Sequence, residues 1–181
     1  RLARALMARR PDLRMTGADI LVRADAALPV QVFDGCQLPF PDGSFDCVLL
    51  ADVLHHAEFP LPLLREAIRV CRLALLIKDH VARTRLDRLL LGFMDWVGNA
   101  RHGVKSTGRY LAPKDWQELW DVLPATPTHW QSRLGLYPFP ASLLFERQLH
   151  CLVRVDPRAV TMKPAPPAEP RCPQSSAPAG D

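Results

Sequence analysis

The sequence predicts an α/β domain with a mostly parallel sheet, helices on both faces and a late antiparallel pair of strands. Two observations support this prediction. Apolar runs of strand length alternate with segments whose apolar residues recur at helical spacing, and this alternation is typical of parallel sheets with right-handed helical crossovers. The composition of the 181 residues, 48% hydrophobic and 23% charged, is that of a folded globular chain.

The first half of the chain supplies helices and strands in turn. Leu2, Leu6 and Met7 lie among arginines in the pattern of an amphipathic helix that stops before Pro11, because the residue before a proline avoids helical conformation. Further elements are expected in this order: strands at 14–20 and 30–33, a strand at 45–51 that is buried on both faces, and a helix at 61–71.

The second half begins with another buried strand at 74–77. A helix at 86–97 and a helix that opens at Pro113 should follow. Trp116 and Trp120 are one helical turn apart, which favours core packing over the lining of a pocket. Strands at 128–134 and 145–155 close the pattern, joined by a proline-rich connection at 135–141.

The expected domain covers residues 1–156. Within it, residues 81–110 combine apolar anchors with glycines that could act as hinges, which suits a lid over the site. The alternative is an ordinary packed helix followed by a surface loop. Residues 157–181 are rich in proline and alanine and lack apolar periodicity, so we expect a disordered tail.

Several classes of function are disfavoured. The net charge of +4 is spread along the chain, so no nucleic-acid partner is expected. No apolar stretch is long enough to span a membrane, and no signal peptide is recognisable. The five cysteines form no CxxC pair, which fits reduced, buried thiols in a cytoplasmic protein. No metal site is expected from His55, His56, His80 and His102, because adjacent histidines diverge and no zinc motif is present. The oligomeric state is not indicated.

Two acids follow predicted strands. Asp19 ends the strand at 14–20, where a carboxylate can accept hydrogen bonds from ribose hydroxyls, although acids also end strands because the sheet edge is wet. Asp34 follows the strand at 30–33, and with Gly35 and the Cys36 amide it could hold an adenine amino group above apolar Leu38 and Phe40. The alternative for Asp34 is a simple Asp-Gly turn.

Three motifs in order carry a resemblance. Residues 38–46 read LPFPDGSFD, residues 54–56 read LHH, and residues 64–70 read LREAIRV. These runs closely resemble the type-11 group of class I S-adenosylmethionine-dependent methyltransferases, over about residues 1–80. The resemblance implies a Rossmann-like fold, S-adenosylmethionine as cofactor, and methyl transfer to a small-molecule acceptor.

The resemblance also implies roles for individual residues. Asp19 would match the ribose-binding acid, Asp34 the acid near the adenine amino group, and Ala51 and Asp52 the strand end near the methionine part of the cofactor. Asp52, His56 and His80 are the candidates for a base, and a structural or solvent-facing role stays open for the histidines. Asp79 precedes His80 directly and could orient it, unless the pair is only a polar strand end.

Two departures from the family pattern qualify this interpretation. A first strand with its glycine-rich loop is absent from these residues, and so is the usual Lys-Pro-Gly-Gly turn before the strand at 74–77. We therefore expect an N-terminally incomplete methyltransferase domain. The alternative function is a catalytically inactive methyltransferase-like binding module. A nicotinamide dehydrogenase shares the ribose-binding acid, but it does not account for the run at 38–46.

Overall fold

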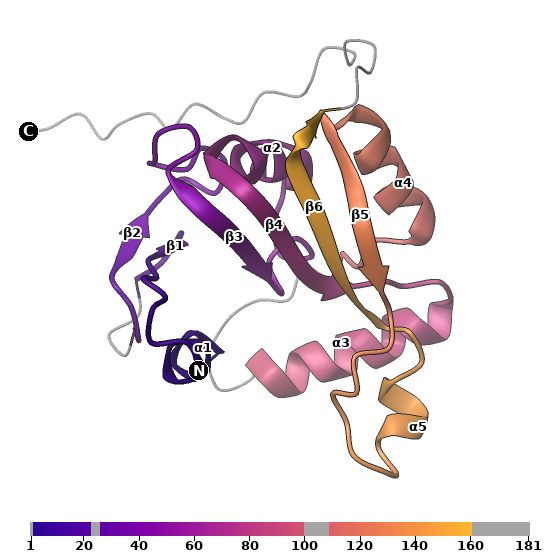
Figure 1. The fold of residues 1–181 in the computed structure, drawn as a ribbon. Helices are drawn as coiled ribbons and strands as arrows, with labels where there is room; N and C mark the ends of the chain where they lie inside the picture. The colour runs from indigo at the N-terminus through magenta and orange to yellow at the C-terminus, as the bar shows by residue number, and fades with distance from the viewer. Residues whose placement is uncertain (1, 23–25, 100–108, 161–181) are drawn as a thin grey trace, which may run out of the picture.

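The described strands form two sheets (Figure 1). The computed structural model describes residues 2–22, 26–99 and 109–160. A two-stranded parallel sheet joins β1 to β2, and a four-stranded sheet has the order β3-β4-β6-β5. The strands are β1 (Gly17–Asp19), β2 (Val30–Val32), β3 (Phe45–Ala51), β4 (Cys71–His80), β5 (Ala125–Gln131) and β6 (His150–Val160).

The larger sheet is mixed rather than mostly parallel. β3 and β4 run parallel and are linked by the helix α2 (Pro60–Val70), whereas β6 is antiparallel to both of its neighbours, β4 and β5. The prediction of an α/β fold with a late antiparallel pair is therefore confirmed, but the prediction of one mostly parallel sheet is wrong for the described residues. Strand order and pairing depend on contacts between distant segments, which local apolar patterns do not encode.

Helices α2 and α4 (Pro113–Val122) pack on the same face of the larger sheet. Leu75 and Ile77 of β4 share one buried cluster with apolar residues of both helices. Neighbouring β4 residues at 74, 76 and 78 point to the other face and are only partly buried. The expectation of helices on both faces is thus not met within the described residues. For the same reason β3 is not buried on both faces, since Asp46 and Cys47 are exposed.

Helix α3 (Arg85–Asn99) lies across the carboxyl ends of β3 and β4 (Figure 1). Its start is fixed by Asp87, whose carboxylate accepts the backbone N–H groups of Arg83 and Thr84 at 2.9 Å each. On its inner side Leu91 is buried against Tyr110 and Leu149. The described part of the expected lid is therefore a packed helix, and residues 100–108 lie outside the described residues. The lid function stays a prediction.

The chain ends differ from the expected boundaries. α1 (Leu2–Arg9) forms as predicted, although none of its residues is buried. Where the strand at 145–155 should begin, the structure has the short helix α5 (Ser142–Phe145), because the carboxylate of Glu146 accepts N–H groups from Gly135, Leu136 and Tyr137 and folds the proline-rich connection back. β6 extends to Val160, so it includes the first residues of the expected tail; residues 161–181 lie outside the described part.

Two further expectations concern cysteines and membranes. Cys71 is a buried free thiol as predicted, and Cys151 is also buried and free. The prediction of reduced, buried thiols is wrong for Cys47, which is free but exposed, and for Cys36, which is half-buried and disulfide-bonded. Burial raises the pKa of the Cys151 thiol to about 12, so it remains protonated at neutral pH. Within the described ranges, every helix is too short or too polar to cross a bilayer.

Candidate functional site

The carboxyl ends of β1 and β2 bring two acids to one sheet edge. Asp19 pairs with Val32 in the parallel register, and the Phe33 N–H donates to the Asp19 carbonyl at 3.2 Å. Asp34 follows at once, so both acids end neighbouring parallel strands. Both are exposed, and Asp19 Oδ1 accepts the N–H of Leu21 at 3.2 Å. Carboxyl edges of parallel strands are where α/β folds bind ligands.

Asp34 is held in a defined orientation by its own turn. Its Oδ1 accepts the backbone N–H of Cys36 at 2.8 Å and that of Gln37 at 2.7 Å. These two hydrogen bonds, the stronger to Gln37, lower the pKa of Asp34 below its usual value, so the group is a carboxylate at neutral pH. Gly35 has φ +84°, a conformation that disfavours any side chain. The Asp-Gly turn therefore exists, and it also orients the second carboxylate oxygen.

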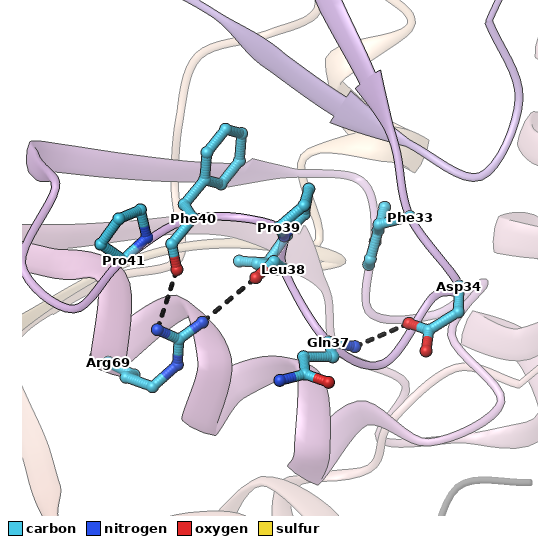
Figure 2. Close-up of a pocket in the computed structure, with 8 residues that line it drawn as sticks. All are labelled: Phe33, Asp34, Gln37, Leu38, Pro39, Phe40, Pro41 and Arg69. Atoms are coloured by element: carbon cyan, nitrogen blue, oxygen red, sulfur yellow. Dashed lines mark hydrogen bonds between the residues drawn. The ribbon is translucent and has the colours of Figure 1, made fainter. Parts of the chain in front are cut away.

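An open pocket of about 550 Å³ borders Asp34 (Figure 2). This volume is in the range of small-molecule sites. One end is formed by Asp34 and Phe33, and the other by Arg69 with the loop at 37–41. Leu38 is buried, and the Phe40 ring packs edge-on against Phe45 at a centroid distance of 4.7 Å. The expected apolar support for an adenine is thus partly used to anchor the loop itself.

Arg69 fastens this loop to α2. Its guanidinium donates to the carbonyls of Leu38 and Phe40 at 3.1 and 2.9 Å (Figure 2). It also donates to the carboxylates of Glu66 and Asp42. Glu66 in turn accepts the Leu38 N–H at 2.9 Å. The two acids raise the pKa of Arg69 further, so it stays charged. The Glu66 and Arg69 pair of the LREAIRV motif therefore has a structural role that the sequence analysis did not identify.

We expect Arg69→Met to lower the free energy of unfolding by about 1–2 kcal/mol, because it removes several charge-assisted hydrogen bonds from a partly buried group. The Arg69 hydrogen bond lowers the pKa of Glu66, so this stabilisation exists above the ordinary Glu pKa of about 4.3 and is lost as the pH falls through the lowered value. The difference in free energy of unfolding between the wild type and Arg69→Met should therefore become smaller below about pH 4.

The matched control is Arg72→Met, because Arg72 forms only an exposed ion pair with Asp46. We expect its effect to be below about 0.5 kcal/mol. Urea unfolding of the wild type and the two variants at pH 7 and at about pH 3 makes the comparison. Equal small losses in both variants at pH 7 would show that Arg69 does not fasten the loop.

The end of β3 forms a second polar region next to the first. Ala51 is the last residue of β3 and pairs with Lys78, and Asp52 follows with φ 56°, a left-handed conformation that is uncommon for an aspartate. The Asp52 N–H donates to the Lys78 carbonyl at 2.8 Å, and Lys78 Nζ reaches the Asp52 carboxylate at 2.5 Å. Asp52 is thus fixed between strand ends while its side chain remains 44% exposed.

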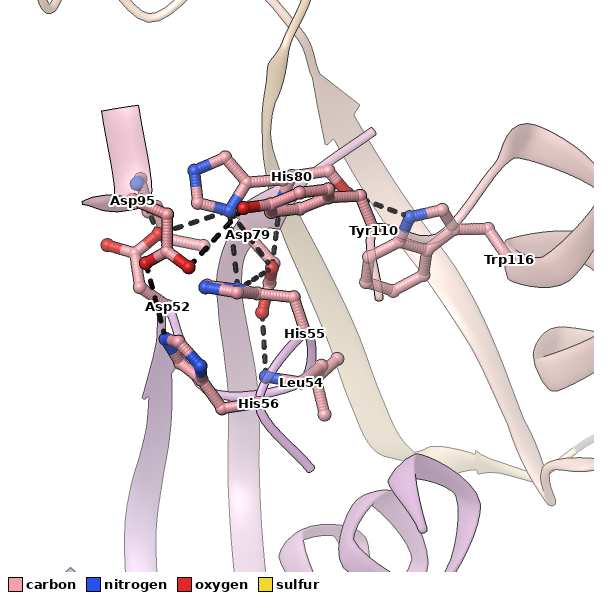
Figure 3. Close-up of polar contacts among 10 residues, drawn as sticks. Asp52, Leu54, His55, His56, Asp79, His80, Asp95, Tyr110 and Trp116 are labelled. Carbon is pink, nitrogen blue, oxygen red and sulfur yellow. Dashed lines mark hydrogen bonds and ion pairs between the residues drawn. The ribbon is translucent and has the colours of Figure 1, made fainter. Parts of the chain in front are cut away.

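A buried cluster of histidines and acids surrounds the end of β4 (Figure 3). His55 Nδ1 lies 2.7 Å from Asp79 Oδ1, and both side chains are almost fully buried. His80 Nδ1 lies 3.3 Å from His55 Nδ1 and 3.8 Å from the carboxylate of Asp52. Burial alone would raise the pKa of Asp79, but its hydrogen bonds with His55 and His80 outweigh that effect and lower it, so the group is ionised.

Two more histidines border this cluster. His56 Nε2 lies 3.7 Å from the carboxylate of Asp95 on α3, and burial lowers the pKa of His56. His150 of β6 pairs with His80 in the antiparallel register, and their ring centroids are 4.9 Å apart. Burial, followed by the positive charge of Lys78, lowers the pKa of His150 to about 4. Both imidazoles are therefore neutral at physiological pH.

The structure thus groups the predicted residues in two regions. Asp19, Asp34, Gly35 and Cys36 lie at the ends of β1 and β2, and the base candidates Asp52, His56 and His80 lie around the ends of β3 and β4. The sequence analysis named Asp79 as a partner that could orient His80, but it did not place Asp95, Tyr110 or His150 in this group, nor pair His55 with Asp79. These contacts join residues far apart in the sequence, and Asp79 lies on the same side of β4 as the buried Ile77.

Comparison with known proteins gives one family match. Residues 3–73 match the sequence profile of a family described as "Methyltransferase domain", a range that covers α1 to the start of β4. No curated protein sequence matches the chain. The family match spans the strand ends with Asp19, Asp34 and Asp52, but it stops before Asp79 and His80.

Solved structures share the fold at low sequence identity. A chain of the complex between the Haloferax volcanii Trm112 methyltransferase activator and a methyltransferase is 18% identical, with a TM-score of 0.56 over 85% of this chain and 77% of that one. A SAM-dependent methyltransferase from Methanosarcina mazei is 14% identical, with a TM-score of 0.50 over 78% and 80%. The [4+2]-cyclase SpnF is 16% identical, with a TM-score of 0.56 over 90% and 70%. At these identities the likeness concerns the fold alone.

Proposed function

Because residues 3–73 match the profile of a methyltransferase domain family, we propose that the protein transfers a methyl group from S-adenosylmethionine to a small-molecule acceptor. The observation that carries this proposal is the pair of acids at the ends of β1 and β2. Asp34 is a carboxylate fixed by two backbone donors, and Asp19 ends the neighbouring parallel strand. A nucleoside needs hydrogen-bond acceptors of this kind at such an edge.

The residues at this edge fit the cofactor. Asp19 would accept hydrogen bonds from the ribose hydroxyls, and the second oxygen of Asp34 would accept one from the adenine amino group. Gly35 has no side chain to obstruct the purine, and the Cys36 amide is held beside it by Asp34. Ala51, at the end of β3, would lie near the methionine part. The acidic character of the edge suits a cationic sulfonium ligand.

Methyl transfer requires little of the protein beyond the positioning of the two reactants. When bound, S-adenosylmethionine supplies an electrophilic methyl group. The chain would orient the acceptor and remove its proton where the acceptor is protonated. Asp52 is the most exposed of the three base candidates, while His80 and His56 are mostly buried with side-chain exposures of 11% and 27%. Because burial lowers the pKa of His56, this imidazole is unprotonated at neutral pH and able to accept a proton.

A second candidate function is a methyltransferase-like module without methyl transfer. The fold neighbour SpnF is described as a [4+2]-cyclase, so this fold also supports proteins named for another reaction. Such a module would keep the nucleoside edge but would not need Asp52, His56 or His80. The two functions therefore differ in what the β3 and β4 ends do.

Calorimetric titration with S-adenosylhomocysteine tests the first part of the proposal. We expect saturable binding to the wild-type chain, and weaker binding after Asp19→Ala, by about 1.5–3 kcal/mol for a lost hydrogen bond to a charged group. Asp12→Ala is the control, because Asp12 is an exposed acid paired only with Arg10. No detectable binding to the wild type, or equal affinity in all three chains, would contradict the nucleoside site.

Transfer of a labelled methyl group to a mixture of small-molecule acceptors separates the two functions. Methyl transfer would produce labelled acceptor at a rate that falls after Asp52→Asn or His80→Gln without loss of cofactor affinity. A chain that binds the cofactor but labels no acceptor would support the binding module instead.

A further inference from the structure

Three side-chain atoms that can bind a metal ion lie close together at the end of β4. Asp79 Oδ1 lies 2.7 Å from His55 Nδ1 and 3.4 Å from His80 Nδ1, and the two Nδ1 atoms are 3.3 Å apart (Figure 3). The three atoms thus form a compact triangle. Ligand atoms of a tetrahedral ion with bonds of about 2.0–2.2 Å are separated by about 3.3–3.6 Å. Two edges of the triangle, 3.3 and 3.4 Å, match this separation, and the 2.7 Å edge between His55 Nδ1 and Asp79 Oδ1 would lengthen when an ion replaces the proton of that hydrogen bond.

The cluster is almost fully buried and is fixed by hydrogen bonds. Asp79 Oδ2 accepts the Leu54 N–H at 2.8 Å, and Asp79 Oδ1 accepts the His80 N–H at the same distance. The His55 ring is stacked on the Tyr110 ring, with centroids 5.7 Å apart. Metal-binding carboxylates and imidazoles are oriented by such outer contacts. The triangle is therefore already assembled and would need little rearrangement to bind an ion.

His150 adds an independent observation. It is 3% exposed, and neither of its ring nitrogens has a hydrogen-bond partner among the described residues. Its ring lies next to His80, with the two planes tilted by 52°. A buried imidazole without partners is costly. A cation held next to it would supply the missing partner, either directly or through a bound water.

We propose that His55, Asp79 and His80 bind a divalent transition-metal ion, for which Zn²⁺ is the best match, with His150 at the edge of the coordination shell. Imidazole and carboxylate ligands in a tight, buried triangle suit zinc, whereas Mg²⁺ and Ca²⁺ prefer shells made of oxygen. The proposal does not rest on methyl transfer, but it shares His80 with the base candidates, and an ion bound to His80 would leave Asp52 and His56 for that role. It also reverses the sequence-based expectation that His55, His56, His80 and His102 form no metal site, because the fold brings His55 and Asp79 next to His80 at the end of β4.

A second arrangement in the same region competes with this one. His55, His56 and Asp95 also offer ligand atoms within 4.8 Å of one another. The first group is favoured because Asp79 is almost fully buried and fixed by two backbone donors, and because the buried His150 lies next to His80. The two arrangements share His55 but differ in His80 and His56, so single substitutions separate them.

The test is titration of the chelator-stripped, full 181-residue chain with Zn²⁺ against a chromophoric chelator, together with the visible spectrum of the Co²⁺ form. We expect about one ion per chain and a Co²⁺ spectrum of four or five nitrogen and oxygen ligands. His55→Gln and His80→Gln should each weaken Zn²⁺ binding at least about 100-fold, since changes in outer contacts alone cost about 10- to 100-fold. His129→Gln is the control, because His129 is exposed on β5.

The remaining outcomes are also decisive. Binding that is lost in His56→Gln but kept in His80→Gln would overturn the proposed ligand set, as would a thiolate band in the Co²⁺ spectrum. Absence of tight binding to the wild type would show that protons rather than a metal occupy the triangle. Should the variants fail to fold, imidazole nitrogen resonances of the wild type decide: those of His55 and His80 should shift with Zn²⁺, and unchanged resonances would contradict the proposal.

Discussion

Replacing Asp79 with alanine should lower the free energy of unfolding by about 3–5 kcal/mol, the cost of removing one partner from a buried charged network. Asp79 is 1% exposed, and its carboxylate is the acceptor for the Leu54 N–H, the His80 N–H and the His55 ring. Alanine leaves all three donors buried without an acceptor. Urea unfolding in the presence of a chelator measures the loss without any contribution from bound metal.

Asp79→Asn is the informative companion. The amide oxygen can still accept one backbone N–H, so we expect a smaller loss, about 1–3 kcal/mol. Asp46→Ala serves as a surface control, because Asp46 is an exposed partner of Arg72, and its effect should be below about 0.5 kcal/mol. A loss under about 1 kcal/mol for Asp79→Ala would mean that the cluster does not stabilise the fold.

The acid dependence of this network has a definite sign. The two histidines hold the pKa of Asp79 below that of an unfolded aspartate, so the folded state binds fewer protons than the unfolded state at moderately acidic pH. The contribution of Asp79 to stability is present above the ordinary value of about 3.9 and is lost as the pH falls below it. The difference in free energy of unfolding between the wild type and Asp79→Ala should therefore become smaller in strong acid.

Asp34→Asn should weaken the binding of S-adenosylhomocysteine by about 1.5–3 kcal/mol, or about 10- to 150-fold. The amide oxygen of asparagine can take over the N–H groups of Cys36 and Gln37, so the turn around Gly35 should be preserved. Its amide nitrogen would then face the adenine amino group, donor against donor. The variant thus removes the proposed recognition without removing the loop.

Asp34→Ala provides the complementary variant, because it removes the acceptor and the turn together. If recognition resides in the carboxylate, both variants should lose affinity by similar factors, and calorimetry should give the same result for S-adenosylmethionine. Wild-type affinity in Asp34→Asn, with an unchanged circular dichroism spectrum, would exclude Asp34 from the binding site.

Local features of the site could be predicted because they depend on neighbours in the chain. Asp19 and Asp34 follow short apolar runs, so the ends of β1 and β2 place them at one edge. The Asp34 turn follows from the Asp-Gly pair itself. The buried Trp116 and Trp120 likewise follow from helical spacing. These predictions required no knowledge of which strands pair.

Other features depend on residues far apart in the sequence. His55 and Asp79 are 24 residues apart, and His150 reaches His80 only through the antiparallel register of β6 on β4. The packing of α2 and α4 on one face of the larger sheet also results from such contacts, and so does helix α5, through the carboxylate of Glu146. A sequence pattern contains the residue types but not these pairings.

The central claim is that the carboxyl edge of β1 and β2 binds the nucleoside of S-adenosylmethionine. Hydrogen exchange of the backbone amides with and without saturating S-adenosylhomocysteine tests it most directly, because it reports where the ligand binds. We expect slower exchange in residues 19–22 and 34–38, and unchanged exchange in α4 and β5. Binding that leaves residues 19–22 and 34–38 unprotected, or that protects only α4 and β5, would contradict the proposed nucleoside site.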